Sequence, residues 1–418
     1  MKKLFSLFVV LMAICTSSWA GQPVLTLSGE VSKGGEGFIT LSIACDGEEI
    51  RDLQVDIILP KGFAFSENEN GSTKVRYHEE IQSADYTAAL NNDDIATYTA
   101  SPRRRLLFNT TTGALMKDGP ILDIFIKEVS STVEIGETAT ALATGSCEST
   151  GDPQITFSLQ HSVTKHQEDT EFTIEVWGAI LDEENKTKNS IATAETGGVL
   201  VKRTIKAGKW NTICLPFAMD NDQVIAVFGD DVEIADFKGI KYENGDKDIS
   251  VKFSRVTPSA IEANHPYIFK PGSKISEDIK RFIVMETVNI SPAKYPEVFF
   301  GDDGFLGNFY VTNYEGDRQD NHLYLSDNKF YYLERGAELE LKGFRGILES
   351  PKIKAYVTNN QSANVNFFVD DETIDGIDGV TTSNKVVEGV YDLQGRKVND
   401  EHLKRGVYII DGKKVVVK

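Results

Sequence analysis

Alternation of apolar and polar residues most constrains the fold of this chain. Period-two stretches occur at Phe38 to Ala44, Leu53 to Leu59 and Ile121 to Val129, between turns rich in Gly, Asn and Asp. This period is typical of strands, whose successive side chains point to opposite faces. Because no long helical pattern separates the stretches, a β-sandwich is favoured over an α/β fold. With 418 residues, we expect an all-β protein of two sandwich modules and a small C-terminal β unit.

The N-terminal segment from Met1 to Ala20 has the features of an export signal. Two lysines precede an apolar run from Leu4 to Cys15, and small polar residues then lead to Ala20 and Gly21. This order predicts a secretory signal peptide cleaved between Ala20 and Gly21. The apolar run is too short to span a hydrocarbon core of roughly 30 Å. We therefore expect no membrane span and a location at the cell surface or outside the cell, with the periplasm as the alternative.

The net charge of the chain limits the classes of molecule that it can bind. The chain has 63 acidic and 44 basic residues, and loss of two signal lysines takes the formal net charge from −19 to −21. Such a chain repels phosphate backbones and anionic lipid surfaces. We therefore expect no nucleic-acid partner.

Three cysteines remain after cleavage, an odd number for an oxidising compartment. Cys45 and Cys147 flank the first predicted sandwich, so a disulfide between them is a possible pairing. Cys214 lies in an apolar stretch, where a cysteine usually behaves as a small buried hydrophobe.

The chain divides by composition into a signal peptide (1–20), a β-sandwich (21–165), a second β-rich domain (169–369), an acidic linker (370–385) and a C-terminal unit (386–418). The polar stretch Asp182 to Thr196 fits either a linker or a loop within one domain.

Two strand predictions follow for the second domain. Trp210 to Leu215 reads as a central strand with Trp210 and Cys214 on one face. Phe330 to Leu333 reads as the returning arm of a hairpin, paired with Leu323 to Leu325 across an Asp-Asn turn.

The first two domains resemble modules of secreted bacterial proteins. The strings RDLQVDIILPKGFAF (51–65) and GPILDIFIKEV (119–129) resemble cohesin-like sandwiches and related carbohydrate-binding modules, which implies an immunoglobulin-like or cohesin-like fold. The strings WNTICLPF (210–217) and GFRG (343–346) resemble an uncharacterised β-sandwich domain of secreted and surface proteins of Bacteroidetes. These resemblances imply a compartment more than a chemistry.

The C-terminal unit has a net positive charge, opposite to that of the whole chain, with seven basic and three acidic residues from 396 to 418. It resembles the terminal part of the sorting domain used for type IX secretion in Bacteroidetes, which implies contact with secretion machinery. A plain structural hairpin is the alternative. The matching positions are Tyr391, Gly395, Arg396, Gly406, Tyr408, Lys413, Lys414 and Lys418.

The sequence contains no recognised nucleophile elbow, phosphate loop or zinc motif. Any glycosidase carboxylate pair would be hidden among the 63 acidic residues. Acidic turns at 230–231, 302–303 and 370–378 suit calcium only weakly, because none has EF-hand spacing. We expect no catalytic residue, cofactor or resident metal, so an enzymatic function is less favoured than a non-enzymatic one.

An arginine run and a group of tyrosines could each contact a ligand, although both also have an ordinary structural explanation. Arg103, Arg104 and Arg105 are candidates for contact with an acidic partner, although such runs are usually solvated loops. Four tyrosines are candidates for stacking on sugar rings, although tyrosines at strand spacing are more often core residues. They are Tyr310, Tyr314, Tyr331 and Tyr332.

Together these features predict an exported, non-enzymatic protein with a role in adhesion, ligand binding or glycan binding, and with a protein or glycan partner at the cell surface. A glycan-active hydrolase, or an accessory carbohydrate-binding subunit, is the alternative. A structural subunit of a fimbria or surface layer is a further one, which predicts self-association through edge strands.

Overall fold

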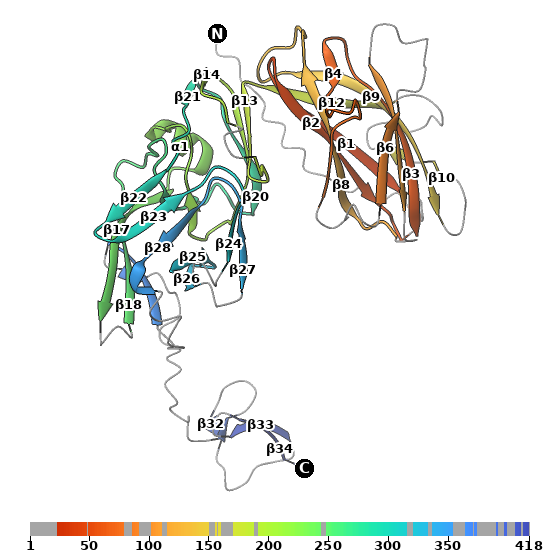
Figure 1. Ribbon diagram of the computed structural model, residues 1–418. Coiled ribbons are helices and arrows are strands. Elements are labelled where there is room, and N and C mark those ends of the chain that lie inside the picture. The colour runs from red at the N-terminus through yellow and green to blue at the C-terminus, as the bar shows by residue number, and fades with distance from the viewer. Residues whose placement is uncertain are drawn as a thin grey trace.

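The computed structural model describes residues 23–47, 49–78, 86–91, 102–110, 115–149, 155–156, 158–159, 170–187, 191–243, 248–315, 321–332, 337–353, 364–370, 372–373, 390–391, 397–398, 406–410 and 413–417. The regular secondary structure of the described chain is almost all β-strand, which confirms the expected all-β class (Figure 1). Its α-helix, α1 (Asn221–Phe228), has eight residues and begins at a capping box formed by Asp220 and Gln223.

The first domain is built from β1 to β12. Its strands are β1 (Val24–Ser32), β2 (Glu36–Ala44), β3 (Ile50–Ile58), β4 (Phe63–Phe65), β5 (Val75–Tyr77), β6 (Tyr86–Asn91), β7 (Arg103–Thr110), β8 (Gly119–Glu128), β9 (Thr138–Ser149), β10 (Ile155–Thr156), β11 (Ser158–Leu159) and β12 (Thr170–Trp177). They pair in the order β4-β8-β2-β1-β12-β9-β3-β7-β6. The predicted stretches coincide with β2, β3 and β8.

Alternate residues of these strands form one core. In β1 and β2, Leu25, Val31, Ile39 and Leu41 are fully buried, and the same period continues through β3, β8 and β12. The strands curl around this core (Figure 1). The alternation seen in the sequence therefore records which face of each strand is inside.

β12 corrects the predicted boundary between the domains. It lies parallel to β1, with Gly29 opposite Ile174, and antiparallel to β9. The predicted boundary at 165–169 would separate β12 from the strands it pairs with. The first domain therefore runs to Trp177, and β13 begins two residues later, at Ala179.

The second domain combines several smaller sheets. Its strands are β13 (Ala179–Asp182), β14 (Ala194–Thr196), β15 (Val199–Ile205), β16 (Asn211–Ile213), β17 (Glu233–Glu243), β18 (Asp248–Arg255), β19 (Tyr267–Lys270), β20 (Ile279–Val284), β21 (Val288–Ile290), β22 (Glu297–Phe300), β23 (Asp303–Gly307), β24 (Thr312–Glu315), β25 (His322–Ser326), β26 (Lys329–Tyr332), β27 (Glu338–Leu341), β28 (Gly346–Glu349), β29 (Asn364–Val369) and β30 (Glu372–Thr373). The larger sheets have the orders β16-β19-β17-β18-β29-β30, β22-β23-β28-β25-β26 and β13-β15-β20.

An aromatic cluster joins the six-stranded and five-stranded sheets. The ring of Phe253 in β18 lies within 6.1 Å, centroid to centroid, of Phe237, Phe305, Phe330 and Phe367. Edge-to-face and offset geometries of this kind add to the stabilisation from burial alone. The two sheets therefore share one core.

The string Trp210 to Leu215 differs from its prediction. The strand covers only β16, which lies at the end of its sheet and has β19 as its one partner among the described strands. Trp210 packs in the aromatic core, whereas Cys214 packs in a separate cluster with Leu215. The residues are buried on both sides because the chain passes between two cores, and not because the strand is central.

Two other predictions can be compared directly. β25 and β26 form the predicted hairpin, and Asp327 and Asn328 have φ values of 48° and 64°, as a two-residue type I′ turn requires. The start of the polar stretch Asp182 to Thr196 is a loop within the domain, because the Gly343 N–H donates to Glu183 O at 2.8 Å.

The C-terminal unit contains β31 (Val390–Tyr391), β32 (Lys397–Val398), β33 (Gly406–Ile410) and β34 (Lys413–Val417). β33 and β34 pair as an antiparallel hairpin. Within the described ranges, no helix is long and apolar enough to cross a bilayer.

Candidate functional site

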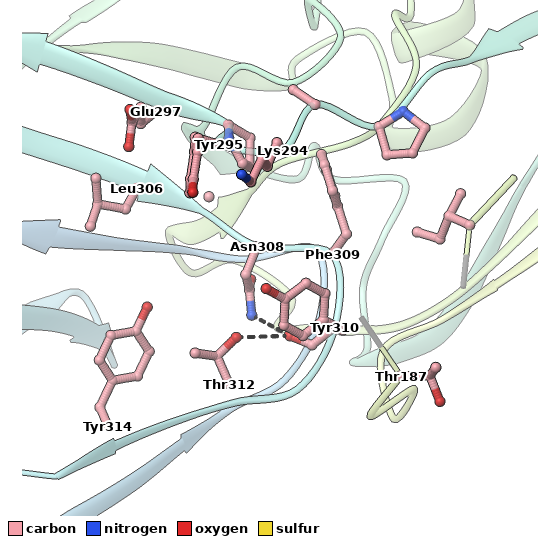
Figure 2. Close-up of a pocket in the computed structure, with 15 residues that line it drawn as sticks. Thr187, Lys294, Tyr295, Glu297, Leu306, Asn308, Phe309, Tyr310, Thr312 and Tyr314 are labelled. Carbon is pink, nitrogen blue, oxygen red and sulfur yellow. Dashed lines mark hydrogen bonds between the residues drawn. The ribbon is translucent and has the colours of Figure 1, made fainter. Parts of the chain in front are cut away.

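The second domain contains a pocket of about 470 Å³ between the segment after β21 and the segment that joins β23 to β24 (Figure 2). Two of the tyrosines singled out in the sequence, Tyr310 and Tyr314, line it, whereas Tyr331 does not; the side chain of Tyr332 lies outside the described part of the chain. The lining residues are Thr187, Ile191, Pro292, Ala293, Lys294, Tyr295, Pro296, Glu297, Leu306, Gly307, Asn308, Phe309, Tyr310, Thr312 and Tyr314.

One wall is the segment 292–296, which is held by polar contacts at both ends. The side chain of Asn264 donates to Ser291 O at 3.0 Å and accepts from the Ala293 N–H at 2.7 Å. Pro296 O accepts from the Gly307 N–H at 2.6 Å. These bonds fix a chain segment that lies outside any strand.

Asn308 shapes the opposite wall. Its buried amide donates to Tyr310 O at 2.8 Å and to Lys342 O at 3.0 Å. Its side-chain oxygen accepts from the Arg345 N–H at 3.0 Å. A single side chain therefore ties the segment after β23 to the segment between β27 and β28.

The exposure of the aromatic side chains falls from the mouth of the pocket to its base. Tyr295 is 63% exposed, Tyr314 is 8% exposed and Phe309 is 5% exposed, while Tyr310 is half-buried. Burial raises the pKa of Tyr314 to about 12, so its phenol stays protonated. The Lys294 ammonium lies 5.0 Å from the ring centroid of Tyr295, which places a cation and an aromatic face together at the mouth.

Charged groups are sparse among the lining residues. Glu297 is the sole carboxylate and Lys294 the sole cation in the described lining. Thr312 Oγ1 donates to Tyr310 O at 3.2 Å, as Figure 2 shows. The pocket is thus suited to an uncharged or weakly charged ligand held by aromatic faces and a few polar atoms.

Cys214 lies directly behind this pocket. A Cβ at Gly307 would meet its Sγ at 2.4 Å, so only glycine fits there. As expected, Cys214 is fully buried and its thiol is free; burial raises its pKa far above the usual range. Nearby, Arg203 is also fully buried, and its Nε and Nη1 atoms have no hydrogen-bond partner among the described residues. Burial and the charge of Arg345 lower the Arg203 pKa to about 9.

The arginine run is not the solvated loop that its composition suggested. Arg103 and Arg105 lie in β7 and both pair with Asp56, with Arg105 Nε 2.7 Å from the carboxylate. Arg104 faces the other way, with Nη2 3.0 Å from Glu67. The three guanidinium groups already have carboxylate partners within the chain.

The possible Cys45–Cys147 disulfide is not formed, because Cys45 is a free thiol. Cys45 is a free, buried thiol whose Sγ lies 3.7 Å from Met116 O, and burial raises its pKa to about 11. The backbone of Cys147 lies in β9, and its side chain is outside the described part of the chain.

The acidic turns proposed for calcium have partners of their own. Asp231 accepts from the Ser273 N–H at 2.8 Å, Asp303 accepts from Ser350 Oγ, and Asp370 pairs with Arg255 at 3.2 Å. Across the described residues, no three His, Cys, Asp or Glu side chains gather in a metal-binding group.

The C-terminal motif is only partly described. Tyr391 lies in β31, Gly406 and Tyr408 lie in β33, and Lys413 and Lys414 lie in β34. The remaining predicted positions, Ala20, Gly21, Gly395, Arg396 and Lys418, lie outside the described residues.

Buried charges mark the junction of the first and second domains. Asp123 in β8 accepts from Arg76 Nε at 2.9 Å and lies 3.0 Å from His78 Nε2. Arg76 also reaches Asp182 of the second domain at 3.1 Å. Burial alone would raise the pKa of Asp123, but the His78 contact, the Arg76 charge and a Thr40 hydrogen bond lower it to about 2.

A second ion cluster lies beside the first. Glu30 pairs with Lys202 and, at 3.6 Å, with Arg281, which also pairs with Glu175 at 2.9 Å. The Lys202 ammonium lies 3.8 Å from the ring centroid of Phe38. Burial raises the pKa of Glu30 despite the Lys202 charge. The contact between the domains is therefore charged rather than purely apolar.

Neither a protein-family model nor a curated protein matches this chain. Solved structures show weak similarity. A cohesin module from a Clostridium perfringens family 33 glycoside hydrolase has 11% identity and a TM-score of 0.26, covering 38% of this chain and 98% of the module. A type III cohesin module of the Ruminococcus flavefaciens ScaE scaffoldin has 10% identity and a TM-score of 0.25, covering 38% and 88%.

The major pilin subunit BcpA of Bacillus cereus has 10% identity and a TM-score of 0.25, covering 83% of this chain and 70% of the pilin. Scores this low do not carry an argument about function. The all-β class rests on the strand pairing described above.

Proposed function

We propose that this chain is an exported, non-enzymatic binding protein whose second domain holds a glycan in the aromatic pocket. The observation that carries the proposal is the arrangement of Tyr295 and Tyr310 around a cavity of about 470 Å³. Large aromatic rings exposed at a cavity mouth are unfavourable in water unless a ligand covers them. The pocket volume lies within the usual range for small-ligand sites.

A sugar fits this chemistry better than a charged metabolite. Sugar rings present apolar C–H faces that pack on aromatic rings, and hydroxyl edges that need a few polar partners. Glu297 and Lys294 stand at the mouth as an acceptor and a donor. Since the lining has one group of each sign, it gives no strong preference for an anion or a cation.

The same lining supports binding rather than glycoside hydrolysis. Hydrolysis by the usual mechanisms needs two carboxyl groups about 5 to 9.5 Å apart across the scissile bond. Glu297 has no second carboxylate beside it among the described lining residues.

The proposed location rests on the two chain ends. The cleavage sequence at Ala20 and Gly21 supports export, and the basic segment 386–418 supports a role as a sorting signal, or descent from one. Mass measurement of the native protein from surface and culture fractions tests this role. Loss of the segment outside the cell supports it; an intact C-terminus there supports the structural hairpin instead.

Binding is tested by screening the mature chain on a glycan array and measuring the strongest interaction by calorimetry. Tyr295→Ala and Tyr310→Ala should each weaken binding about tenfold, since an aromatic stacking contact contributes about 0.5–1.5 kcal/mol beyond the area it buries. Tyr331→Ala is the matched control, because Tyr331 is 42% exposed and does not line the pocket.

Two results would contradict the proposal. One is an array with no binding at high protein concentration. The other is equal weakening by Tyr331→Ala and Tyr295→Ala, which would place the ligand elsewhere.

A further inference from the structure

β22 is an edge strand that leaves unusually large apolar side chains uncovered. It ends the five-stranded sheet, and among the described strands it pairs only with β23. Phe299 is 54% exposed and Phe300 is 58% exposed. Successive strand residues point to opposite faces, so both faces of this edge carry an exposed phenylalanine.

The edge also lacks the usual protection. Proteins commonly shield such strands with lysines, with prolines inside the strand, with bulges, or with a covering loop. Lysine and proline are absent from Glu297 to Phe300. The ring of Phe300 rests over Gly239 of β17, yet no described strand pairs with the outer edge of β22. In Figure 1, β22 lies on the side of the second domain away from the first domain.

The hairpin geometry shows which backbone groups point outward. Pro296 O accepts from the Gly307 N–H of β23, and the turn at Gly301 and Asp302 makes Phe300 and Asp303 the closing pair. Because hydrogen-bonding direction alternates along a strand, Val298 and Phe300 bond inward to β23. Phe299 therefore directs its N–H and C=O to the open edge.

We propose that β22 pairs antiparallel with β22 of a second copy of this chain, about a two-fold axis through Phe299. Only registers that oppose outward-facing residues are allowed in an antiparallel ladder. The register centred on Phe299 places the two Phe299 rings opposite each other on one face. On the other face, Val298 of each copy lies opposite Phe300 of its partner.

Charge favours this register and this occupant. In it Glu297 lies opposite Gly301, so the two Glu297 carboxylates fall at opposite ends of the paired strands and do not repel at close range. Like charges directly opposite each other destabilise a sheet, whereas aromatic and β-branched pairs stabilise it. The edge is thus complementary to itself, and a two-fold contact of this kind closes after one partner.

The size of the contact sets its strength. A phenylalanine buries about 150–250 Å² when fully covered, so four half-exposed rings give on the order of 400 Å² of aromatic surface. This is about a third of the smallest area that stable interfaces bury. We therefore expect a weak dimer, half-formed on the order of 100 µM chain. This inference does not depend on the glycan pocket.

Sedimentation of the mature full-length chain between about 5 and 500 µM tests the association. Phe299→Pro is the decisive variant, because the proline removes an outward N–H without breaking a bond to β23, as edge strands tolerate. We expect the wild type to dimerise and Phe299→Pro to associate at least tenfold more weakly. If Phe299→Pro fails to fold by circular dichroism, Phe299→Lys takes its place, since it puts like charges opposite each other at the axis. A wild type that stays monomeric throughout overturns the proposal.

Cross-linking tests the register. Opposed residues of a hydrogen-bonded antiparallel pair have Cα atoms about 5.5 Å apart, a separation that a disulfide can bridge. Phe299→Cys should therefore form a covalent dimer under mild oxidation. Tyr331→Cys is the control, since Tyr331 is exposed on β26 at the other end of the same sheet. Equal cross-linking of the two variants would show random collision and refute the register.

Discussion

The replacement Asn308→Ala tests whether one side chain holds the pocket together. Asn308 is 7% exposed, and its amide makes bonds of 2.8, 3.0 and 3.2 Å to three carbonyl oxygens while accepting one at 3.0 Å from Arg345. A typical hydrogen bond contributes about 1 kcal/mol net, and a buried group left without a partner costs about 1–3 kcal/mol. Because two amide hydrogens are shared among the three carbonyl oxygens, we expect the replacement to lower the free energy of unfolding by about 3 kcal/mol.

The assay is differential scanning calorimetry of the second-domain transition. A loss of about 3 kcal/mol should lower the melting temperature of a domain of this size by about 6–12 °C. Transitions of a multidomain chain need not be two-state, so the first-domain transition serves as the internal reference and should not move. Glycan affinity at temperatures where the variant is folded should also fall, because Asn308 positions the Tyr310 backbone.

Asn321→Ala provides the matched control. Within the described residues, Asn321 makes one side-chain bond, to Glu349 at 2.7 Å, and the loss of this bond should lower the free energy of unfolding by no more than about 1.5 kcal/mol. A penalty below about 1 kcal/mol for Asn308→Ala, or one equal to that of Asn321→Ala, would refute the reasoning that the four contacts of Asn308 support the wall.

Three further predictions concern buried groups. With its pKa lowered to about 2, Asp123 stabilises the fold above about pH 4, and this contribution is lost as the pH falls toward 2. In urea titrations over that range, the free energy of unfolding should therefore fall by about 2 kcal/mol more for the wild type than for Asp123→Asn. Arg203→Met should raise the free energy of unfolding by about 1–3 kcal/mol in the same titrations, since it removes a buried cation whose Nε and Nη1 atoms have no partner among the described residues. A marked loss of stability would show that the hydrogen bond from Arg203 Nη2 to Thr212 O outweighs the cost of burying the cation. In a thiol assay at pH 8, Cys45 and Cys214 should stay unreactive in the native chain because both are buried, leaving at most Cys147; three reactive thiols after denaturation would confirm that none is disulfide-bonded.

The elements predicted correctly are those whose signal is local. The β2, β3 and β8 stretches alternate because each has one face in the core, and the Asp327-Asn328 pair is a turn because both residues adopt positive φ. Such patterns are visible in a short window of sequence. The strand β12 was assigned to the wrong domain because its partner β1 lies at the opposite end of the domain's sequence, and such a distant pairing leaves no local trace.

The site was less accessible to sequence reasoning. Tyr310 and Tyr314 were found through their aromatic character, whereas Tyr295 and Asn308 were missed. Asn308 acts through backbone carbonyls of the distant β27–β28 segment, and an isolated Asn carries no sign of this. The arginine run was misread for the same reason, because Asp56 lies 47 residues from Arg103 in sequence.

The parallel pairing of β1 with β12 determines how the first domain responds to mechanical load. Force entering near the N-terminus pulls on the start of β1, and force passed to the second domain pulls on the end of β12 at Trp177. Because the two strands run in the same direction side by side, tension slides one along the other and loads their hydrogen bonds together instead of opening them one after another. Resistance to such stretching is governed by the unfolding rate rather than by equilibrium stability. The first domain is thus arranged to transmit tension to the second domain without its strands separating one hydrogen bond at a time.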